Sequence, residues 1–125
     1  MRNKPEDALH MAVAAYLNAA LVAPDWWTTF PAGSGGKARG GQLKAKGLKA
    51  GVPDILLLKG VQSSLDSAPA FWIELKAEKG RASKDQVETI NSLISAGCSV
   101  RICRSVADVE SVLRAWGFGL KARLT

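Results

Sequence analysis

The segment 71–104 reads FWIELKAEKGRASKDQVETINSLISAGCSVRICR and places an amphipathic stretch between two short apolar runs. Residues 71–77 and 99–104 have the length and the apolar, partly β-branched content of buried strands. Between them, Ser83 followed by Gln86 is the pattern of a capping box that opens a helix. Two parallel strands require a connection of this length, so the segment predicts a strand–helix–strand crossover.

Three further elements are predicted outside this crossover. Residues 4–22 carry apolar side chains at helical spacing, residues 55–59 form an apolar run typical of a buried strand, and residues 106–116 predict a last helix. Residues 24–50 are aromatic, then glycine-rich, then basic, and we expect a flexible, irregular region there, with a hairpin as an alternative. The order α–β–β–α–β–α predicts an α/β fold with a central mixed sheet flanked by helices.

Length and composition describe one ordinary globular domain. The chain has 125 residues, of which 47% are hydrophobic and 22% charged, so we expect a single domain over 1–125. No apolar run approaches the length of a membrane span, and the N-terminus lacks a secretory cleavage pattern, which together predict a cytoplasmic protein. Cys98 and Cys103 lie about 16 Å apart along a strand, too far for a disulfide.

The charge points to nucleic acid as the partner. Lys and Arg number 17 against 11 Asp and Glu, which gives a net charge of +6. Five cations and no acid lie within 37–49, among glycines. This stretch is interpreted either as a solvated loop or as a loop that follows a phosphate backbone. The predicted DNA contacts are Lys37, Arg39, Lys44, Lys46, Lys49, Lys79 and Arg81.

Charged residues interrupt the apolar strand 71–77. Side chains alternate along a strand, so Trp72, Glu74 and Lys76 share the face opposite the core-facing residues. Buried charges are costly unless they are paired or bind a metal ion, so folding alone gives little reason for them. The alternative is an ion pair at a solvated strand end.

Asp54 adds a second carboxylate to this argument. It follows the turn Gly51-Val52-Pro53 and begins the preceding strand, so it approaches Glu74 if the two strands are neighbours. Two carboxylates beside a lysine suit a hard cation such as Mg²⁺. Such an ion polarises a phosphoryl group and lowers the pKa of bound water. The alternative is an aspartate that stabilises the turn.

Three blocks of the sequence carry a family resemblance. Residues 51–57 (GVPDILL), 72–76 (WIELK) and 80–86 (GRASKDQ) together resemble the VRR-NUC branch of the PD-(D/E)-x-K nuclease superfamily, over about residues 5–110. The resemblance implies a restriction-endonuclease-like domain. It also implies a deoxyribonuclease that hydrolyses phosphodiester bonds with Mg²⁺ or Mn²⁺.

The resemblance also implies roles for individual residues. Asp54 and Glu74 match the metal ligands, Lys76 matches the catalytic lysine, and the carbonyl group of Leu75 commonly completes the metal shell. Glu6 matches a metal-binding glutamate on the first helix, and its alternative role is a first-turn acid that complements the helix dipole.

Three other positions remain open. Gln86 matches a family glutamine near the active site, and it also fits the capping box with Ser83. His10 lies one turn beyond Glu6 and is interpreted as a residue at the edge of the site. Trp26 and Trp27 are interpreted either as core or dimer packing or as platforms for bases.

Small members of this branch resemble Holliday-junction resolvases that act as homodimers. A four-way junction is roughly two-fold symmetric, and a two-fold dimer supplies two matched catalytic sites. We therefore expect a structure-selective endodeoxyribonuclease that acts as a homodimer on branched DNA. The alternatives are a non-catalytic basic DNA-binding module on the same fold and a restriction-type, sequence-specific nuclease.

Overall fold

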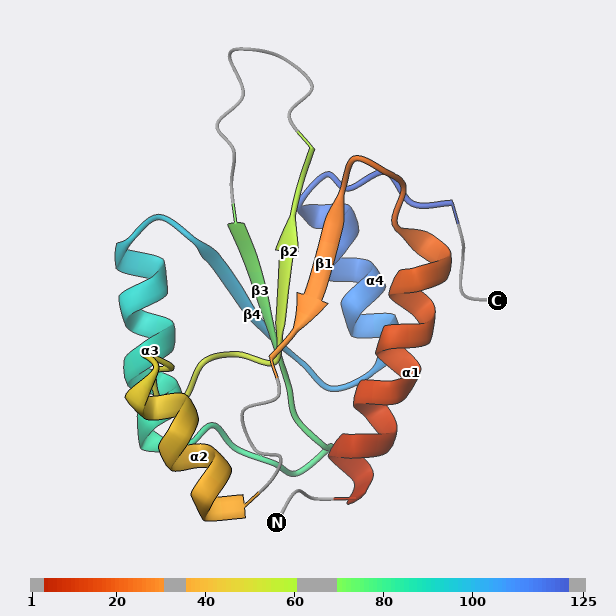
Figure 1. Cartoon of the computed structure of the whole chain (residues 1–125). Coiled ribbons are helices and arrows are strands. Elements are labelled where there is room, and N and C mark those ends of the chain that lie inside the picture. Colours follow the sequence, from red (N-terminus) through yellow and green to blue (C-terminus); the bar gives the residue numbers. More distant parts are fainter. Residues whose placement is uncertain (1–3, 31–35, 61–69, 122–125) are drawn as a thin grey trace.

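The computed structural model describes residues 4–30, 36–60 and 70–121, which form four helices and four strands. In chain order these are α1 (Lys4–Ala20), β1 (Trp26–Thr29), α2 (Gly36–Ala45), β2 (Ile55–Leu58), β3 (Ala70–Leu75), α3 (Lys84–Ser95), β4 (Ser99–Cys103) and α4 (Val106–Ala115). Figure 1 shows a layered arrangement in which α1 and α4 cover one face of the sheet and α3 lies on the other. The predicted α/β class, with helices on both sides of a central sheet, is confirmed.

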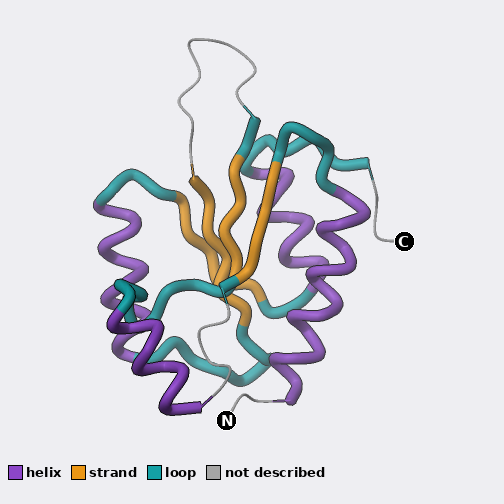
Figure 2. The backbone as a smooth tube through the Cα atoms, viewed as in Figure 1, coloured by secondary structure: helices purple, strands orange, loops and turns teal. Residues whose placement is uncertain are grey.

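The sheet is mixed and has the order β1-β2-β3-β4. β1 pairs with β2 and β2 with β3 in antiparallel fashion, whereas β3 pairs with β4 in parallel. The predicted parallel crossover is therefore present, and α3 forms its connection (Figure 2). In the β2–β3 ladder Ile55 lies opposite Ile73. One residue beyond this pair, Asp54 and Glu74 share the same face of the sheet, because opposed residues of an antiparallel pair point to the same side.

The expectation of an irregular, flexible region over 24–50 is wrong in two places, where β1 and α2 form. β1 has only four residues and is stabilised by pairing with β2, a long-range contact that its own sequence does not specify. α2 contains glycines, each about 1 kcal/mol worse than alanine in a helix, so local propensity argues against this helix. Its end is regular: Gly47 has φ +107° and the amide of Leu48 donates to the carbonyl of Leu43 at 2.9 Å.

One hydrophobic core lies between the sheet and the helices α1 and α4. Its members come from α1, from the inward face of β2 and β3, from β4 and from α4, and include Val13, Leu17, Ile55, Leu57, Ile73, Leu75, Val109 and Leu113. By contrast, α3 contributes no buried residue, and Val87 and Ile94 on it are 46% and 52% exposed. The opposite face of the sheet is therefore less tightly covered by its helix.

The predictions on cysteines and membrane spans can be compared with this fold. Cys103 is buried, Cys98 is half-buried, and both are free, as predicted. Within the residues that the structure describes, no helix has the length and apolar character needed to cross a bilayer.

The two tryptophans of β1 have different environments, so we expect different effects from replacing them. Trp27 packs against the core, whereas Trp26 is 53% exposed. Trp27→Ala should lower the free energy of unfolding by about 2–3 kcal/mol, and Trp26→Ala by less than about 1 kcal/mol. Urea unfolding of the two variants measures this difference, and equal losses would contradict the assignment of Trp27 to the core.

Candidate active site

The end of β3 and the residue that follows it bury two charged side chains on the face opposite the core. Phe71, Ile73 and Leu75 point into the core, so alternation directs Glu74 and Lys76 to the other side. Their residues are only 2% and 8% exposed. The alternative of a solvated ion pair at a strand end is therefore excluded by their burial.

The turn before β2 brings the second carboxylate to this face. The Oδ2 atom of Asp54 accepts a hydrogen bond from the backbone amide of Leu75 at 2.8 Å. The backbone carbonyl group of Asp54 accepts hydrogen bonds from the backbone amide of Phe30 at 3.0 Å and from the hydroxyl of Thr29 at 2.9 Å. Asp54 is thus fixed to β1 through its backbone and to β3 through its carboxylate, beside Glu74.

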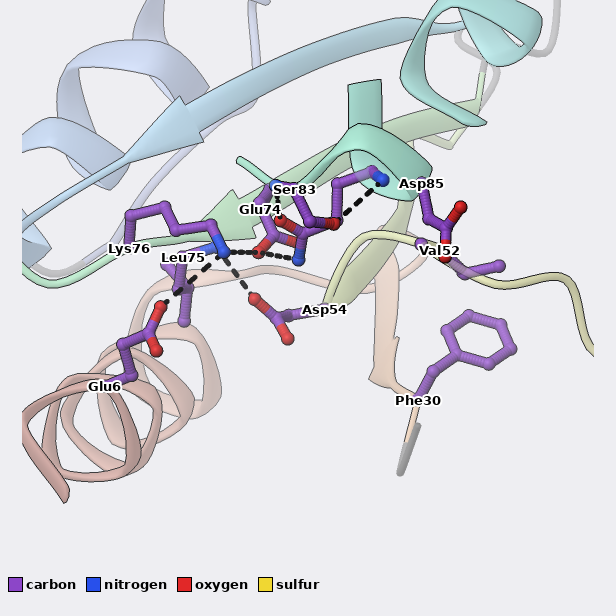
Figure 3. A pocket seen from close by; sticks show the side chains of 11 residues that line it. Glu6, Phe30, Val52, Asp54, Glu74, Leu75, Lys76, Ser83 and Asp85 are labelled. Atoms are coloured by element: carbon purple, nitrogen blue, oxygen red, sulfur yellow. Dashed lines mark hydrogen bonds and ion pairs between the residues drawn. The ribbon is translucent and has the colours of Figure 1, made fainter. Parts of the chain in front are cut away.

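The ammonium group of Lys76 lies among carboxylates. Its Nζ atom is 3.3 Å from Oε2 of Glu74 and 3.8 Å from Oε1 of Glu6, which is carried by α1. Figure 3 shows Glu6, Asp54 and Glu74 directed toward this ammonium group from three different segments of the chain. The site therefore holds more negative than positive charge in a partly buried space.

This charge excess changes the acidity of Glu74. Burial, and after it the negative charge of Asp54, raise the pKa of Glu74 from 4.5 to about 7 against the opposing effect of Lys76. A carboxylate that is hard to ionise beside a second carboxylate gains from an additional positive charge. A divalent cation supplies such a charge.

The donor set suits a hard cation in part. Asp54 and Glu74 supply two carboxylates, and the carbonyl group of Leu75 points to the same side of β3 as its amide, which donates to Asp54. Among the described residues, however, no group of three His, Cys, Asp or Glu side chains converges tightly enough to hold a metal ion alone. Mg²⁺ normally keeps several waters, so two carboxylates and a carbonyl are a sufficient protein contribution.

Gln86 connects the capping box of α3 to Glu74. Its Oε1 atom accepts from the amide of Ser83 at 2.9 Å, and its Nε2 atom donates to Oε2 of Glu74 at 2.9 Å. The hydroxyl of Ser83 in turn accepts from the amide of Gln86 at 3.1 Å. The two alternatives for Gln86, helix cap and site residue, are therefore both present in its geometry.

These side chains line a pocket of about 300 Å³, which contains residues that sequence reasoning did not single out. Phe30 and Asp85 line it, and the Phe30 ring stacks on Trp72 with ring centroids 5.6 Å apart. Phe30 follows a strand that the sequence did not reveal, so no local signal could have placed it there. His10 is hydrogen-bonded to Thr29 at 2.8 Å, which places it beside the strand that leads to Phe30.

The predicted DNA-contacting cations lie on two segments. Lys44 belongs to α2, Lys46 and Lys49 follow it, and all three are exposed; Lys37 and Arg39 also belong to α2, but their side chains lie outside the described part. Lys79 and Arg81 are exposed between β3 and α3.

The arginine that directly follows β4, Arg104, is hydrogen-bonded to the segment that carries Lys79. The guanidinium group of Arg104 donates to the carbonyls of Ala77 and Gly80 at 2.9 and 2.7 Å. Sequence reasoning treated Arg104 only as the end of a strand. Its contacts fix the backbone that presents Lys79 and Arg81 to solvent.

Comparisons with known proteins agree with this geometry. Residues 32–107 match the family model of the VRR-NUC domain. This match and the mixed four-stranded sheet define a nuclease of the PD-(D/E)XK type, a class that hydrolyses phosphodiester bonds. Within that class, the chain belongs to the VRR-NUC family. Glu6 lies outside the matched residues.

A solved structure shows the same fold. It is described as a "VRR_NUC domain protein" and is similar to this chain with a TM-score of 0.69. The similarity covers 94% of this chain and 91% of the other, at 19% sequence identity. No curated protein sequence matches the chain.

The raised pKa of Glu74 predicts a pH-dependent stability. The folded protein holds a proton on Glu74 up to about pH 7, whereas the unfolded chain releases it near 4.5, so the free energy of unfolding falls between these pH values. The loss is on the order of 3 kcal/mol. Glu74→Gln should remove most of it, measured by urea unfolding with chelator from pH 5 to pH 8.

The exposed acid Glu88 supplies the control for this experiment. Glu88→Gln should follow the wild-type pH dependence, because its carboxylate is in water in both states. If Glu74→Gln and the wild type lose stability in parallel as the pH rises, the assignment of the buried acid is wrong.

Proposed function

We propose that this protein is a metal-dependent, structure-selective endodeoxyribonuclease that resolves four-way DNA junctions as a homodimer. In this proposal, a single domain over 1–125 carries the candidate site. The observation that supports this most directly is the pair of carboxylates, Asp54 and Glu74, beside the buried ammonium group of Lys76. The family supports nuclease chemistry, and the choice of substrate rests on size, charge and symmetry.

Mg²⁺ or Mn²⁺ is the proposed cofactor, held by Asp54, Glu74 and the carbonyl group of Leu75, with Glu6 close by. When bound, such an ion polarises the phosphodiester and makes an attacking water more acidic. The carboxylate of Asp54 is already oriented by the backbone amide of Leu75, and that of Glu74 by the side-chain amide of Gln86. The protein therefore fixes two ligand directions in advance, which lowers the entropic cost of assembling the site.

Lys76 acts on the reacting phosphate. As an ammonium group it donates hydrogen bonds, so it orients the attacking water and offsets negative charge that develops on the phosphoryl oxygens. Its contacts with Glu74 and Glu6 keep its long side chain within the pocket. Gln86 is a second catalytic candidate, because it sets the orientation of Glu74 through a direct hydrogen bond.

The exposed cations supply recognition of the DNA backbone. The contacts proposed above lie on α2, on the segment after it and between β3 and α3. Two of them, Lys49 and Arg81, are each two residues away in the chain from a residue that lines the pocket. The described residues form one nuclease-type fold, and the proposed DNA contacts on it are lysines and arginines suited to phosphates. Phosphate contacts and DNA shape therefore dominate recognition, which favours selection by structure over selection by sequence.

Removing the charge of Asp54 or the amine of Lys76 should abolish cleavage. Asp54→Asn keeps an acceptor for the amide of Leu75 but lowers the charge at the metal site, and Lys76→Ala removes the amine. We expect the rate of Mn²⁺-dependent cleavage to fall by at least about 100-fold in both, with DNA binding largely retained. Cleavage of labelled branched DNA with and without chelator measures this.

Lys121→Ala is the matched control, because Lys121 is exposed and carries no assigned role. It should cleave like the wild type. Absence of metal-dependent cleavage by the wild type on every substrate, together with retained binding, would identify a non-catalytic DNA-binding module instead.

A panel of DNA substrates tests the proposed specificity and oligomeric state together. The protein should nick a four-way junction at two symmetric positions faster than flapped or linear duplexes of the same sequence. Its mass in solution should be about twice the 13.2 kDa of one chain. A defined cut within linear duplex would identify a restriction-type nuclease, and a monomer active on junctions would contradict the homodimer.

A further inference from the structure

The turn that carries Asp54 lies directly against the first turn of α3. Gly51 has φ +80°, and a methyl group on it would overlap the carbonyl group of Asp85 and lie 2.6 Å from the amide nitrogen of Gln86. The two backbones therefore touch at this point. Only glycine combines this close approach with a positive φ at low cost.

A side-chain hydrogen bond lies next to this contact. The hydroxyl of Thr89 donates to the carbonyl group of Ala50 at 2.5 Å. Thr89 lies one helical turn after Asp85, so both contacts come from the same face of α3. α3 therefore contacts two successive residues of the turn, Ala50 through a hydrogen bond and Gly51 through the backbone.

The position of this turn is transmitted to Asp54 through a short, stiff connection. Only Val52 and Pro53 separate Gly51 from Asp54, and Pro53 is fully buried and has a fixed φ. A shift of the turn on α3 therefore pulls on Asp54 against the hydrogen bonds that hold it to β1 and β3.

The same end of α3 also holds the second carboxylate. Gln86 donates to Glu74, while Gly51 and Thr89 fix the segment that leads to Asp54. α3 contributes no buried residue and packs through half-buried side chains such as Ile90 and Leu93, so these polar and backbone contacts gain importance. The helix connects two carboxylates that repel each other when no ion lies between them.

We propose that Thr89 is a positioning residue that, with the Gly51 contact, sets the distance between Asp54 and Glu74. This inference rests on the proposed function, because it assigns Thr89 a task in that metal site. The hydroxyl of Thr89 does not touch the substrate; it acts through Ala50 and the turn. Loss of this hydrogen bond leaves both carboxylates present but poorly placed for one ion.

Thr89→Val tests the inference, since valine keeps the shape and removes the hydroxyl. We expect the Mn²⁺ concentration at half-maximal cleavage to rise and kcat to fall, each by about tenfold, with a smaller change in KM for DNA. The rise in unfolding temperature on adding Mn²⁺ to the protein alone should shrink in parallel. Thr89→Ser should restore wild-type behaviour.

Ser92→Ala is the matched control on the same helix. The hydroxyl of Ser92 donates to the carbonyl group of Glu88 one turn earlier on the same helix, at 3.1 Å. The hydroxyl of Thr89 instead donates to Ala50, outside the helix. Ser92→Ala should keep the wild-type response to Mn²⁺. Equal effects of Ser92→Ala and Thr89→Val would show a general effect on α3 and overturn the positioning role.

A pair of glycine variants tests the backbone contact independently. Gly47 and Gly51 both have positive φ, but a methyl group on Gly47 would meet nothing within 4 Å. Gly51→Ala should weaken the response to Mn²⁺, whereas Gly47→Ala should retain it despite a similar backbone cost. This comparison applies even if Thr89→Val fails to fold.

The outcomes separate this inference from the proposed function. A wild type without metal-dependent cleavage or a thermal response to Mn²⁺ would overturn both. An active wild type with a folded Thr89→Val variant of unchanged metal response and kcat would overturn the role of Thr89 alone.

Discussion

The ion pair between Glu74 and Lys76, buried at the C-terminal end of the inner strand β3, is the constraint around which the structure is arranged. Two buried charges cost several kcal/mol each to remove from water, and a single pairing contact seldom compensates fully. Here Oε2 of Glu74 also accepts a hydrogen bond from the side-chain amide of Gln86, and the ammonium group of Lys76 also lies near the carboxylate of Glu6. The pair therefore depends on α1 and α3 as well as on its own strand, and stability alone does not explain its presence.

The strand that carries this pair could be predicted from the sequence, but β1 and α2 could not. The alternation in the 71–77 run predicted which side chains face the core, and the capping box predicted the start of α3. The approach of Asp54 to Glu74 required the assumption that β2 and β3 are neighbours, and the ladder between them confirms it. β1 and α2 could not be predicted, because one is four residues long and the other contains helix-disfavouring glycines.

The same reasoning explains which parts of the candidate site the sequence missed. The capping pattern marked Ser83 and Gln86, but the contact of Gln86 with Glu74 depends on where α3 lies on the sheet. Phe30 and Thr89 reach the site through pairings between segments 20 to 40 residues apart, and such pairings have no local signature. Glu6 was ambiguous as a first-turn acid until the packing of α1 placed it 3.8 Å from Lys76.

The charges of this protein act over two different distances. The chain carries a net charge of +6, yet its pocket is lined by four carboxylates and one lysine. Exposed cations such as Lys44 and Lys46 are the proposed contacts for the DNA backbone, and their attraction extends over roughly a Debye length, about 8–10 Å at physiological salt. The acidic pocket acts only at contact distance, where it repels a bare phosphate. In the proposed mechanism a divalent cation reverses that local repulsion, so variants of the pocket should lose cleavage while they keep DNA binding.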